Sequence, residues 1–262
     1  MNVIDSFRLN GKTAIVTGGA GRYGKQIVEA LAEAGAEVFI ASRNLEKSEE
    51  VAAMFRAKDL HVYALQLDLS DKQSIDDMVQ EVYKRTGRID VLINNAVTRS
   101  ACSGWAQELE NYDQSLHVNA SATFYITAVV AEIMKKQQEG SIINIGSFMG
   151  LVGPEFANYE GTTMGGNPSP IYFYEKGGLV NFTRWAASVL GKDNIRVNAI
   201  HPGGLQEDHL PAAFVKNYSA RTQLGRLASQ EDLKGIIVFL ASKASSYLTG
   251  TNIPVDGGYT AK

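Results

Sequence analysis

Short apolar runs rich in β-branched residues alternate with amphipathic stretches along almost the whole chain, and this alternation constrains the fold more than any other feature. The runs predict strands at Lys12–Thr17, Glu37–Ala41, His61–Leu67, Ile89–Asn94, Ser141–Ile145, Arg196–Ile200 and Asn252–Val255. The amphipathic stretches predict helices at Lys25–Gly35, Leu45–Lys58, Ser74–Arg85, Tyr112–Lys136, Phe173–Leu190 and Gln230–Ala241. Strands that alternate with helices build a parallel sheet with helical crossovers, and strands buried on both faces are continuously apolar, as these are.

The fold class that follows is α/β, a single doubly wound parallel-sheet domain over residues 1–262. No Pro/Ser-rich linker and no internal repeat interrupts the series. Ligands of such sheets bind beyond the carboxyl ends of the strands. Residues that directly follow a predicted strand are therefore the first candidates for a functional site.

Composition narrows the classes of partner. The formal net charge is −3 and no long basic run occurs, which argues against nucleic acid or an anionic membrane. The single cysteine, Cys102, excludes an internal disulfide and fits a reducing compartment. Met1–Gly11 has no apolar signal segment, and the apolar runs are shorter than the roughly 18 residues of a membrane span. We expect a cytoplasmic protein.

A metal site is not expected. The histidines show no ligand spacing with one another or with Cys102; they are His61, His117, His201 and His209. His201, directly before Pro202, is predicted to be structural.

The glycine-rich segment Thr17–Gly24 lies between the first predicted strand and the first predicted helix. Glycines allow the chain to turn tightly and allow a pyrophosphate to approach the N–H groups at a helix N-terminus. We predict a dinucleotide site that includes Gly18, Gly21, Arg22, Tyr23 and Gly24. A tight strand-to-helix turn without a ligand is the alternative, because a glycine-rich turn alone is a weak signal.

The residues after the second predicted strand bear on cofactor choice. NAD sites commonly place an acidic side chain there for the ribose 2′-hydroxyl, whereas an arginine accommodates a 2′-phosphate. Here Ser42-Arg43 follows, with no acid at that position. NADP(H) is therefore favoured over NAD(H), and Arg22 offers a second positive charge. In the alternative interpretation, both arginines are merely solvated surface residues.

Tyr172 and Lys176 lie four residues apart at the start of a predicted helix, so their side chains share one face. An ammonium group beside a phenol stabilises the phenolate, which makes tyrosine useful in proton transfer. Tyr159 and Tyr174 have no lysine at this spacing. A tyrosine–lysine pair on a helix surface without catalytic meaning is the alternative.

The chain resembles the short-chain dehydrogenase/reductase family, a Rossmann-fold family, over essentially its whole length. The matching segments, in chain order, are Thr17–Gly24, Asp68-Leu69, Asn94-Asn95-Ala96, Asn119, Ile142–Ser147, Tyr172 with Lys176, Pro202-Gly203, and Thr249-Gly250 with Val255–Gly258. Each segment alone is weak. Their order and separations together make the resemblance specific.

The resemblance implies roles for individual residues. The catalytic tetrad of the family falls on Asn119, Ser147, Tyr172 and Lys176. Tyr172 then exchanges a proton with the substrate oxygen, Ser147 hydrogen-bonds that oxygen, Lys176 also holds the nicotinamide ribose, and Asn119 supports Lys176 through a water. Further cofactor contacts are implied for Asp68 and Leu69 at the adenine, and for Asn95, Ala96, Pro202, Gly203 and Leu205 along the dinucleotide.

The chain also departs from the family pattern. Arg22 and Val97 stand where glycine is usual, and Gly204–Glu207 follows Pro202-Gly203 in place of a threonine that reaches the carboxamide. Tyr172 follows Ser147 by 25 residues, a longer separation than is usual. The extra residues form an insertion at about 155–169, predicted beside the mouth of the site; an oligomer contact or a disordered loop is the alternative.

Residues 204–218 correspond to the substrate lid of the family, and His209, Phe214 and Tyr218 are candidates to face substrate. The leading functional hypothesis is an NADP(H)-dependent oxidoreductase for a secondary alcohol/ketone pair. A weaker resemblance to oxidoreductases of sugar and nucleotide-sugar pathways, including flagellin modification, suggests a sugar derivative as substrate.

The alternatives are a 3-oxoacyl-thioester or polyol/gluconate-type reductase, and a non-catalytic cofactor-binding regulator. A homo-oligomer, dimer or tetramer, is expected through the helices Tyr112–Lys136 and Phe173–Leu190.

Overall fold

A parallel β-sheet runs through the centre of the molecule. The structure is a computed structural model that describes residues 2–99, 104, 108–164 and 169–261. These residues form one seven-stranded sheet in the order β3-β2-β1-β4-β5-β6-β7, with every neighbouring pair parallel. The strands are β1 (Thr13–Thr17), β2 (Glu37–Ser42), β3 (Val62–Gln66), β4 (Val91–Asn94), β5 (Gly140–Ile145), β6 (Ile195–Pro202) and β7 (Asn252–Val255). The predicted doubly wound α/β fold is confirmed.

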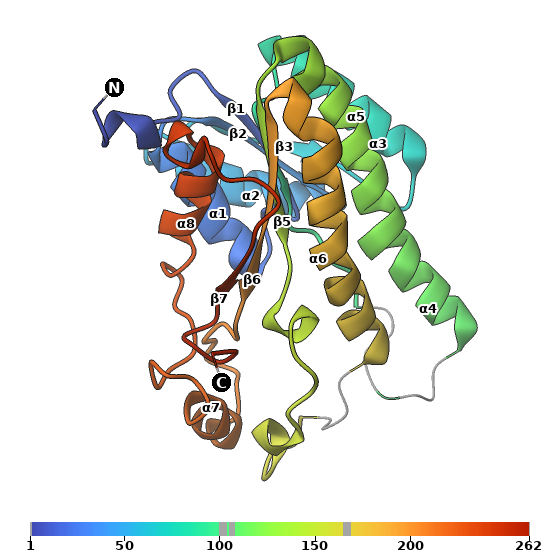
Figure 1. Ribbon diagram of the computed structural model, residues 1–262, viewed down its shortest axis with the longest axis vertical. Helices are drawn as coiled ribbons and strands as arrows, with labels where there is room; N and C mark the ends of the chain where they lie inside the picture. The colour runs from blue at the N-terminus through green and yellow to red at the C-terminus, as the bar shows by residue number, and fades with distance from the viewer. Residues whose placement is uncertain (1, 100–103, 105–107, 165–168, 262) are drawn as a thin grey trace.

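Helices cover both faces of the sheet (Figure 1). One layer contains α1 (Arg22–Glu33), α2 (Leu45–Arg56) and α8 (Lys234–Ala241). The other contains α3 (Lys72–Thr86), α5 (Ala122–Gln137) and α6 (Pro170–Leu190). Beyond the carboxyl ends of the strands lie α4 (Leu109–Leu116) and α7 (Ala212–Ser219). Each layer buries its own apolar cluster against the sheet, which is why the strands are apolar on both faces.

Two helix predictions need correction. The helix predicted at Gln230–Ala241 begins only at Lys234, because the preceding backbone is held in a turn: Ser229 donates its N–H to the Asp232 carboxylate. The helix predicted at Tyr112–Lys136 begins at Leu109 and contains a π-helical turn at His117–Ser121 that separates α4 from α5. Apolar periodicity does not reveal such a turn.

The strand order reverses beside β1, which has β2 on one side and β4 on the other. Hydrogen bonds fix the ends of β1 and β4 to each other. The Thr17 hydroxyl accepts from the N–H groups of Asn95 and Ala96, both at 3.0 Å. The Asn95 amide donates to the carbonyls of Thr17 and Gly18 at 2.9 and 3.0 Å. At such a reversal, helices leave in opposite directions and open a crevice for a ligand.

The continuous helical run Leu109–Gln137 is long and apolar enough, by length and composition alone, to cross a membrane. In this structure 39% of its most apolar window is buried, and the α5 part of the run packs one face against the sheet. Ile126, Val130 and Met134 are fully buried in the cluster between α5 and the sheet.

Candidate active site

The glycine-rich loop leads from β1 into α1, and at two of its glycines the backbone packs too closely for a side chain to fit. Gly18 has φ +64°, in the left-handed region that favours glycine, and a Cβ there would lie 2.9 Å from the Cα of Ala96. A Cβ on Gly24 would overlap the carbonyl oxygen of Gly18. Gly21 precedes α1 without a side-chain cap, so no side chain occupies the N–H groups of the first turn. The loop therefore fits a dinucleotide pyrophosphate.

Arg22 and Tyr23 join this loop to the segment that follows β6. The Arg22 Nε lies 3.1 Å from the Glu207 carboxylate. The Tyr23 hydroxyl donates to the carbonyl of Gly203 at 2.8 Å, and burial raises the pKa of Tyr23, so the phenol keeps its proton. A cofactor contact of either residue stays a prediction.

The ends of β2 and β3 bring a hydroxyl, a cation and a carboxylate to one edge. Ser42 pairs with Gln66 across the two strands, so Arg43 and Asp68 follow neighbouring strand ends. Hydrogen bonds from the Ser70 hydroxyl and backbone, together with the charge of Arg43, hold the pKa of Asp68 below its usual value. Leu69 is buried beneath them. An adenosine 2′-phosphate would meet Arg43 and Ser42 here.

Tyr172 and Lys176 lie on consecutive turns of α6, which begins with Pro170 at its first position. The Lys176 Nζ lies 5.7 Å from the centre of the Tyr172 ring. It also donates to the carbonyl of Ile145 at 2.8 Å, and Lys176 is only 8% exposed. A buried ammonium is costly without such an acceptor. The structure thus brings the predicted pair together at the carboxyl end of β5.

Ser147 lies at the same strand end. It is buried, and its hydroxyl accepts from the N–H of Met149 at 3.2 Å. One ring nitrogen of His201 lies 3.1 Å from the carbonyl of Ser147 and the other lies 2.9 Å from Asn252 Oδ1. Burial lowers the pKa of His201, which favours the neutral ring. His201 thus connects β5, β6 and β7, which agrees with its predicted structural role.

Asn119 lies within the π-helical turn between α4 and α5. Its side chain brackets the backbone of Thr98: Oδ1 accepts from the N–H of Thr98 at 2.8 Å, and Nδ2 donates to its carbonyl at 2.9 Å. Single π turns within helices occur frequently at functional sites. The predicted water-mediated link from Asn119 to Lys176 stays a prediction.

Comparisons with known proteins agree with this geometry. A family profile described as Enoyl-(Acyl carrier protein) reductase matches residues 22–260. The 3-oxoacyl-[acyl-carrier-protein] reductase FabG of Thermotoga maritima is 34% identical over 257 residues, which cover 96% of this chain and 98% of the relative.

Two solved structures share the fold over the whole of this chain. A gluconate 5-dehydrogenase from Burkholderia cenocepacia, in complex with NADP and tartrate, has a TM-score of 0.88 and 28% identity, with both chains covered completely. The NADPH-dependent 3-quinuclidinone reductase of Rhodotorula rubra has a TM-score of 0.86 and 30% identity, with 96% of that chain covered.

This protein belongs to the short-chain dehydrogenase/reductase family. Members of this family are oxidoreductases that act on CH–OH groups with a nicotinamide cofactor. The expected family and reaction class are both confirmed.

The predicted lid of this short-chain dehydrogenase/reductase is partly helical, since residues 204–218 include most of α7. Phe214 and Tyr218 are buried in an aromatic cluster with Phe148, Tyr159 and Tyr259. Of the three candidates to face substrate, Phe214 and Tyr218 therefore pack mainly against other rings, and their own ring centroids are 5.7 Å apart. The third, His209, is exposed.

The insertion of this short-chain dehydrogenase/reductase packs against the same helix. Its described part, residues 155–164 and 169, includes the short helix η4 (Phe156–Tyr159); residues 165–168 lie outside the described residues. Asn158 donates to the Tyr259 hydroxyl at 2.8 Å, and Glu155 pairs with Arg221 at 3.4 Å. The ring of Tyr159 lies 5.6 Å from that of Phe214. The insertion is thus joined to α7 and to the C-terminal segment.

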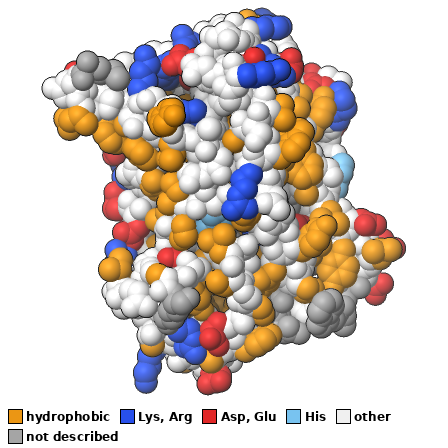
Figure 2. Space-filling model, viewed as in Figure 1, with side chains coloured by type: hydrophobic (Ala, Val, Ile, Leu, Met, Phe, Trp, Pro, Cys, Tyr) orange, Lys and Arg blue, Asp and Glu red, His pale blue; other side chains and the backbone are white. Residues whose placement is uncertain are grey.

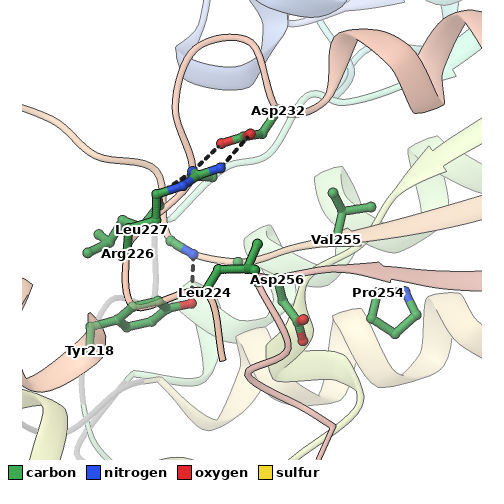
Figure 3. Close-up of a pocket in the computed structure, with 12 residues that line it drawn as sticks. Tyr218, Leu224, Arg226, Leu227, Asp232, Pro254, Val255 and Asp256 are labelled. Carbon is green, nitrogen blue, oxygen red and sulfur yellow. Dashed lines mark hydrogen bonds and ion pairs between the residues drawn. The ribbon is translucent and has the colours of Figure 1, made fainter. Parts of the chain in front are cut away.

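A cavity of about 210 Å³ opens behind the end of β6 (Figure 3). Gly203 and Gly204 line it, and Pro202 ends the strand beside it. The Tyr218 hydroxyl accepts from the N–H of Gly204 at 2.7 Å, and Arg226 pairs with Asp232. Leu205, predicted to lie along the cofactor, is buried beside Ala228. The four predicted catalytic residues do not line this cavity, whereas Gly203, a predicted cofactor contact, does.

Two charged residues near Tyr172 were missed at the sequence level. The guanidinium carbon of Arg99 lies 5.5 Å from the centre of the Tyr172 ring. Glu175, directly before Lys176, is buried on α6 and points to Asn119. Glu175 is the one acidic residue of α6, and this was the available signal for it. Within the described residues, no group of three or more His, Cys, Asp or Glu side chains could hold a metal; Cys102 lies outside that part of the chain.

Proposed function

We propose that this protein is an NADP(H)-dependent oxidoreductase that acts on a secondary alcohol/ketone pair, with Tyr172 as the proton-transfer residue. One observation carries the proposal: Tyr172 and the buried Lys176 lie together on α6, at the strand end that also positions Ser147. The whole chain, residues 1–262, acts as one dinucleotide-binding unit in this proposal.

Each catalytic side chain has a distinct task. The nicotinamide supplies or accepts the hydride when the cofactor is bound. In reduction, Tyr172 gives its proton to the substrate oxygen; in oxidation it takes that proton. The Ser147 hydroxyl donates a hydrogen bond to the same oxygen and stabilises the charge that develops on it. Lys176 stabilises the phenolate of Tyr172 with its fixed positive charge.

NADP(H) is the proposed cofactor, with NAD(H) as the alternative. Ser42 and Arg43 follow β2, and no acidic side chain stands at that position. The gluconate 5-dehydrogenase structure contains NADP, and the 3-quinuclidinone reductase is NADPH-dependent. Gly18, Gly21 and Gly24 would hold the pyrophosphate, and Asp68, Leu69, Asn95 and Ala96 would lie along the adenosine half.

The substrate class has a leading candidate and an alternative. A sugar or sugar derivative is the leading one, from the weaker resemblance to oxidoreductases of sugar pathways. The alternative is a 3-oxoacyl thioester or a polyol/gluconate-type substrate, supported by the 34% identity to FabG and by the likeness to a gluconate 5-dehydrogenase. A purely cofactor-binding regulator is disfavoured because Tyr172, Lys176 and Ser147 are all present and placed together.

A homo-oligomer in the cytoplasm completes the proposal. Phe124 on α5 and Trp185 on α6 are 47% and 64% exposed, and both pack against Phe182. Figure 2 shows hydrophobic side chains gathered on the α5–α6 side of the molecule. A second copy of the chain would cover this face by a two-fold contact. The single cysteine fits a reducing compartment.

The test is a turnover screen of oxo-sugars, oxo-sugar acids, simple ketones and 3-oxoacyl thioesters with NADPH and with NADH. We expect NADPH-linked reduction of at least one class. Tyr172→Phe should lower kcat about 10²–10⁴-fold, since phenylalanine cannot transfer a proton, with the NADPH Kd changed less than about threefold. Turnover by this variant equal to that of the natural chain would refute the assignment.

A further inference from the structure

Glu175 is a charged residue in a place where charge is costly. It lies on α6 between Tyr172 and Lys176, and only 7% of it is exposed. A buried carboxylate is tolerated only when its oxygens are hydrogen-bonded. The hydrogen-bond partners of the Glu175 carboxylate therefore indicate what this side chain does.

Both carboxylate oxygens have a partner on the neighbouring helical run. The Ser115 hydroxyl, on α4, donates to Oε1 at 2.7 Å. The Asn119 Nδ2, in the π-helical turn, donates to Oε2 at 2.9 Å. Glu175 thus spans the gap between α6 and the helix that contains the π turn.

These bonds complete the donor capacity of the Asn119 amide. An amide nitrogen has two hydrogens, and here Thr98 O and Glu175 Oε2 each lie 2.9 Å from it. Its oxygen accepts from the N–H of Thr98. With Glu175 absent, one amide hydrogen would retain only the longer 3.2 Å contact to the Ser115 hydroxyl. The carboxylate therefore fixes the rotation of the Asn119 amide and its distance from α6.

Three segments of the proposed site meet in this network. Thr98 follows the cofactor-facing residues Asn95 and Ala96, Asn119 is the predicted support of Lys176, and Glu175 directly precedes Lys176 on α6. A shift of one segment is transmitted to the others because Thr98 is bonded to Asn119 and Asn119 is bonded to Glu175.

We propose that Glu175 is a positioning residue for the Tyr172–Lys176 pair, acting by hydrogen bonding rather than by its charge. It holds Asn119 and the segment at Thr98 in register with α6. This inference rests on the proposed function, since it assigns Glu175 a task in that reaction.

The test separates geometry from charge. Glu175→Gln keeps the length of the side chain: its oxygen can accept from Asn119, and its amide can donate to the Ser115 hydroxyl. Glu175→Asp keeps the charge but is one methylene shorter. We expect kcat of E175Q to stay within about threefold of the natural chain, and kcat of E175D and E175A to fall about tenfold or more. KM for NADPH should change less than about threefold in all three.

A double-mutant cycle with Asn119→Ala adds a readout that a general loss of stability would not produce. If Glu175 acts through Asn119, the kcat of N119A/E175A should equal that of N119A within about twofold. Tyr174→Phe, at the adjacent and exposed position, is the matched control and should leave kcat unchanged.

Three results would overturn the inference: E175A with natural kcat, E175D more active than E175Q, or multiplicative losses in the double variant. If E175A does not fold, the order of E175Q and E175D still decides. Absence of any NADPH- or NADH-linked turnover by the natural chain would instead refute the proposed function, so the two failures are distinguishable.

Discussion

Arg43 is the side chain at which the two nicotinamide cofactors should be distinguished. A guanidinium–phosphate contact is a charge-assisted hydrogen bond that contributes about 1.5–3 kcal/mol. We expect Arg43→Ser to raise KM for NADPH by about tenfold or more and to leave KM for NADH within about twofold. Steady-state kinetics with both cofactors measure this. Equal losses with both cofactors would assign Arg43 a structural role instead.

For individual residues, the sequence predicted which side chains form the candidate site but not the groups to which they hydrogen-bond. The glycines of Thr17–Gly24 and the Tyr172–Lys176 spacing are local patterns, so a single segment sufficed to propose them. The carbonyl of Ile145 that accepts from Lys176, and the Glu207 carboxylate that pairs with Arg22, come from distant segments. Such partners depend on how the chain packs, and no local pattern contains them.

Asp90 connects the start of β1 to the segment before β4, at the opposite end of the sheet from the site. Its carboxylate accepts from the N–H of Thr13 at 2.9 Å, from Lys12 at 3.0 Å and from Arg88. Burial raises the pKa of Asp90, but hydrogen bonds from Arg88, Thr13 and Lys12 outweigh it, so the pKa lies below its usual value. The stabilisation is therefore complete above the unfolded pKa of about 3.9 and is lost as pH falls through the folded value.

We expect Asp90→Asn to lower the free energy of unfolding by about 2–4 kcal/mol at pH 7, because two cations lose their buried partner. The difference from the natural chain should shrink below about pH 3.5. Urea unfolding of both proteins at pH 7 and at pH 3 tests this. A difference that is the same at pH 7 and pH 3 would show that the charge of Asp90 contributes nothing.

The positions of the helices and strands were predictable because the sheet is buried on both faces. Its strands are therefore continuously apolar, and its helices are amphipathic. The breaks within helices were not. The π turn at His117–Ser121 contains no glycine or proline, and the late start of α8 depends on the Ser229–Asp232 hydrogen bond. Element existence follows from apolar pattern, whereas irregularities follow from individual hydrogen bonds.

At the scale of the whole molecule, exposed apolar side chains of α5 and α6 form a face that a second copy would cover. Central interface aromatics commonly contribute 2 kcal/mol or more to association, about thirtyfold in Kd. We expect Trp185→Glu to shift the proposed homo-oligomer toward a smaller species. Size-exclusion chromatography with light scattering measures the mass. Tyr247→Glu, at a fully exposed tyrosine outside this face, is the control and should leave the mass unchanged.

The hydrogen bonds between Thr17 and Asn95 have a consequence for synthesis of the chain. They join residues 78 positions apart, and β4 supplies the second wall of the crevice beside β1. A nascent chain that ends before Val91 contains the glycine-rich loop but lacks that wall. Because long-range closure must precede such contacts, the dinucleotide crevice is acquired late in folding. An N-terminal fragment carrying the whole glycine motif should therefore not retain the nucleotide.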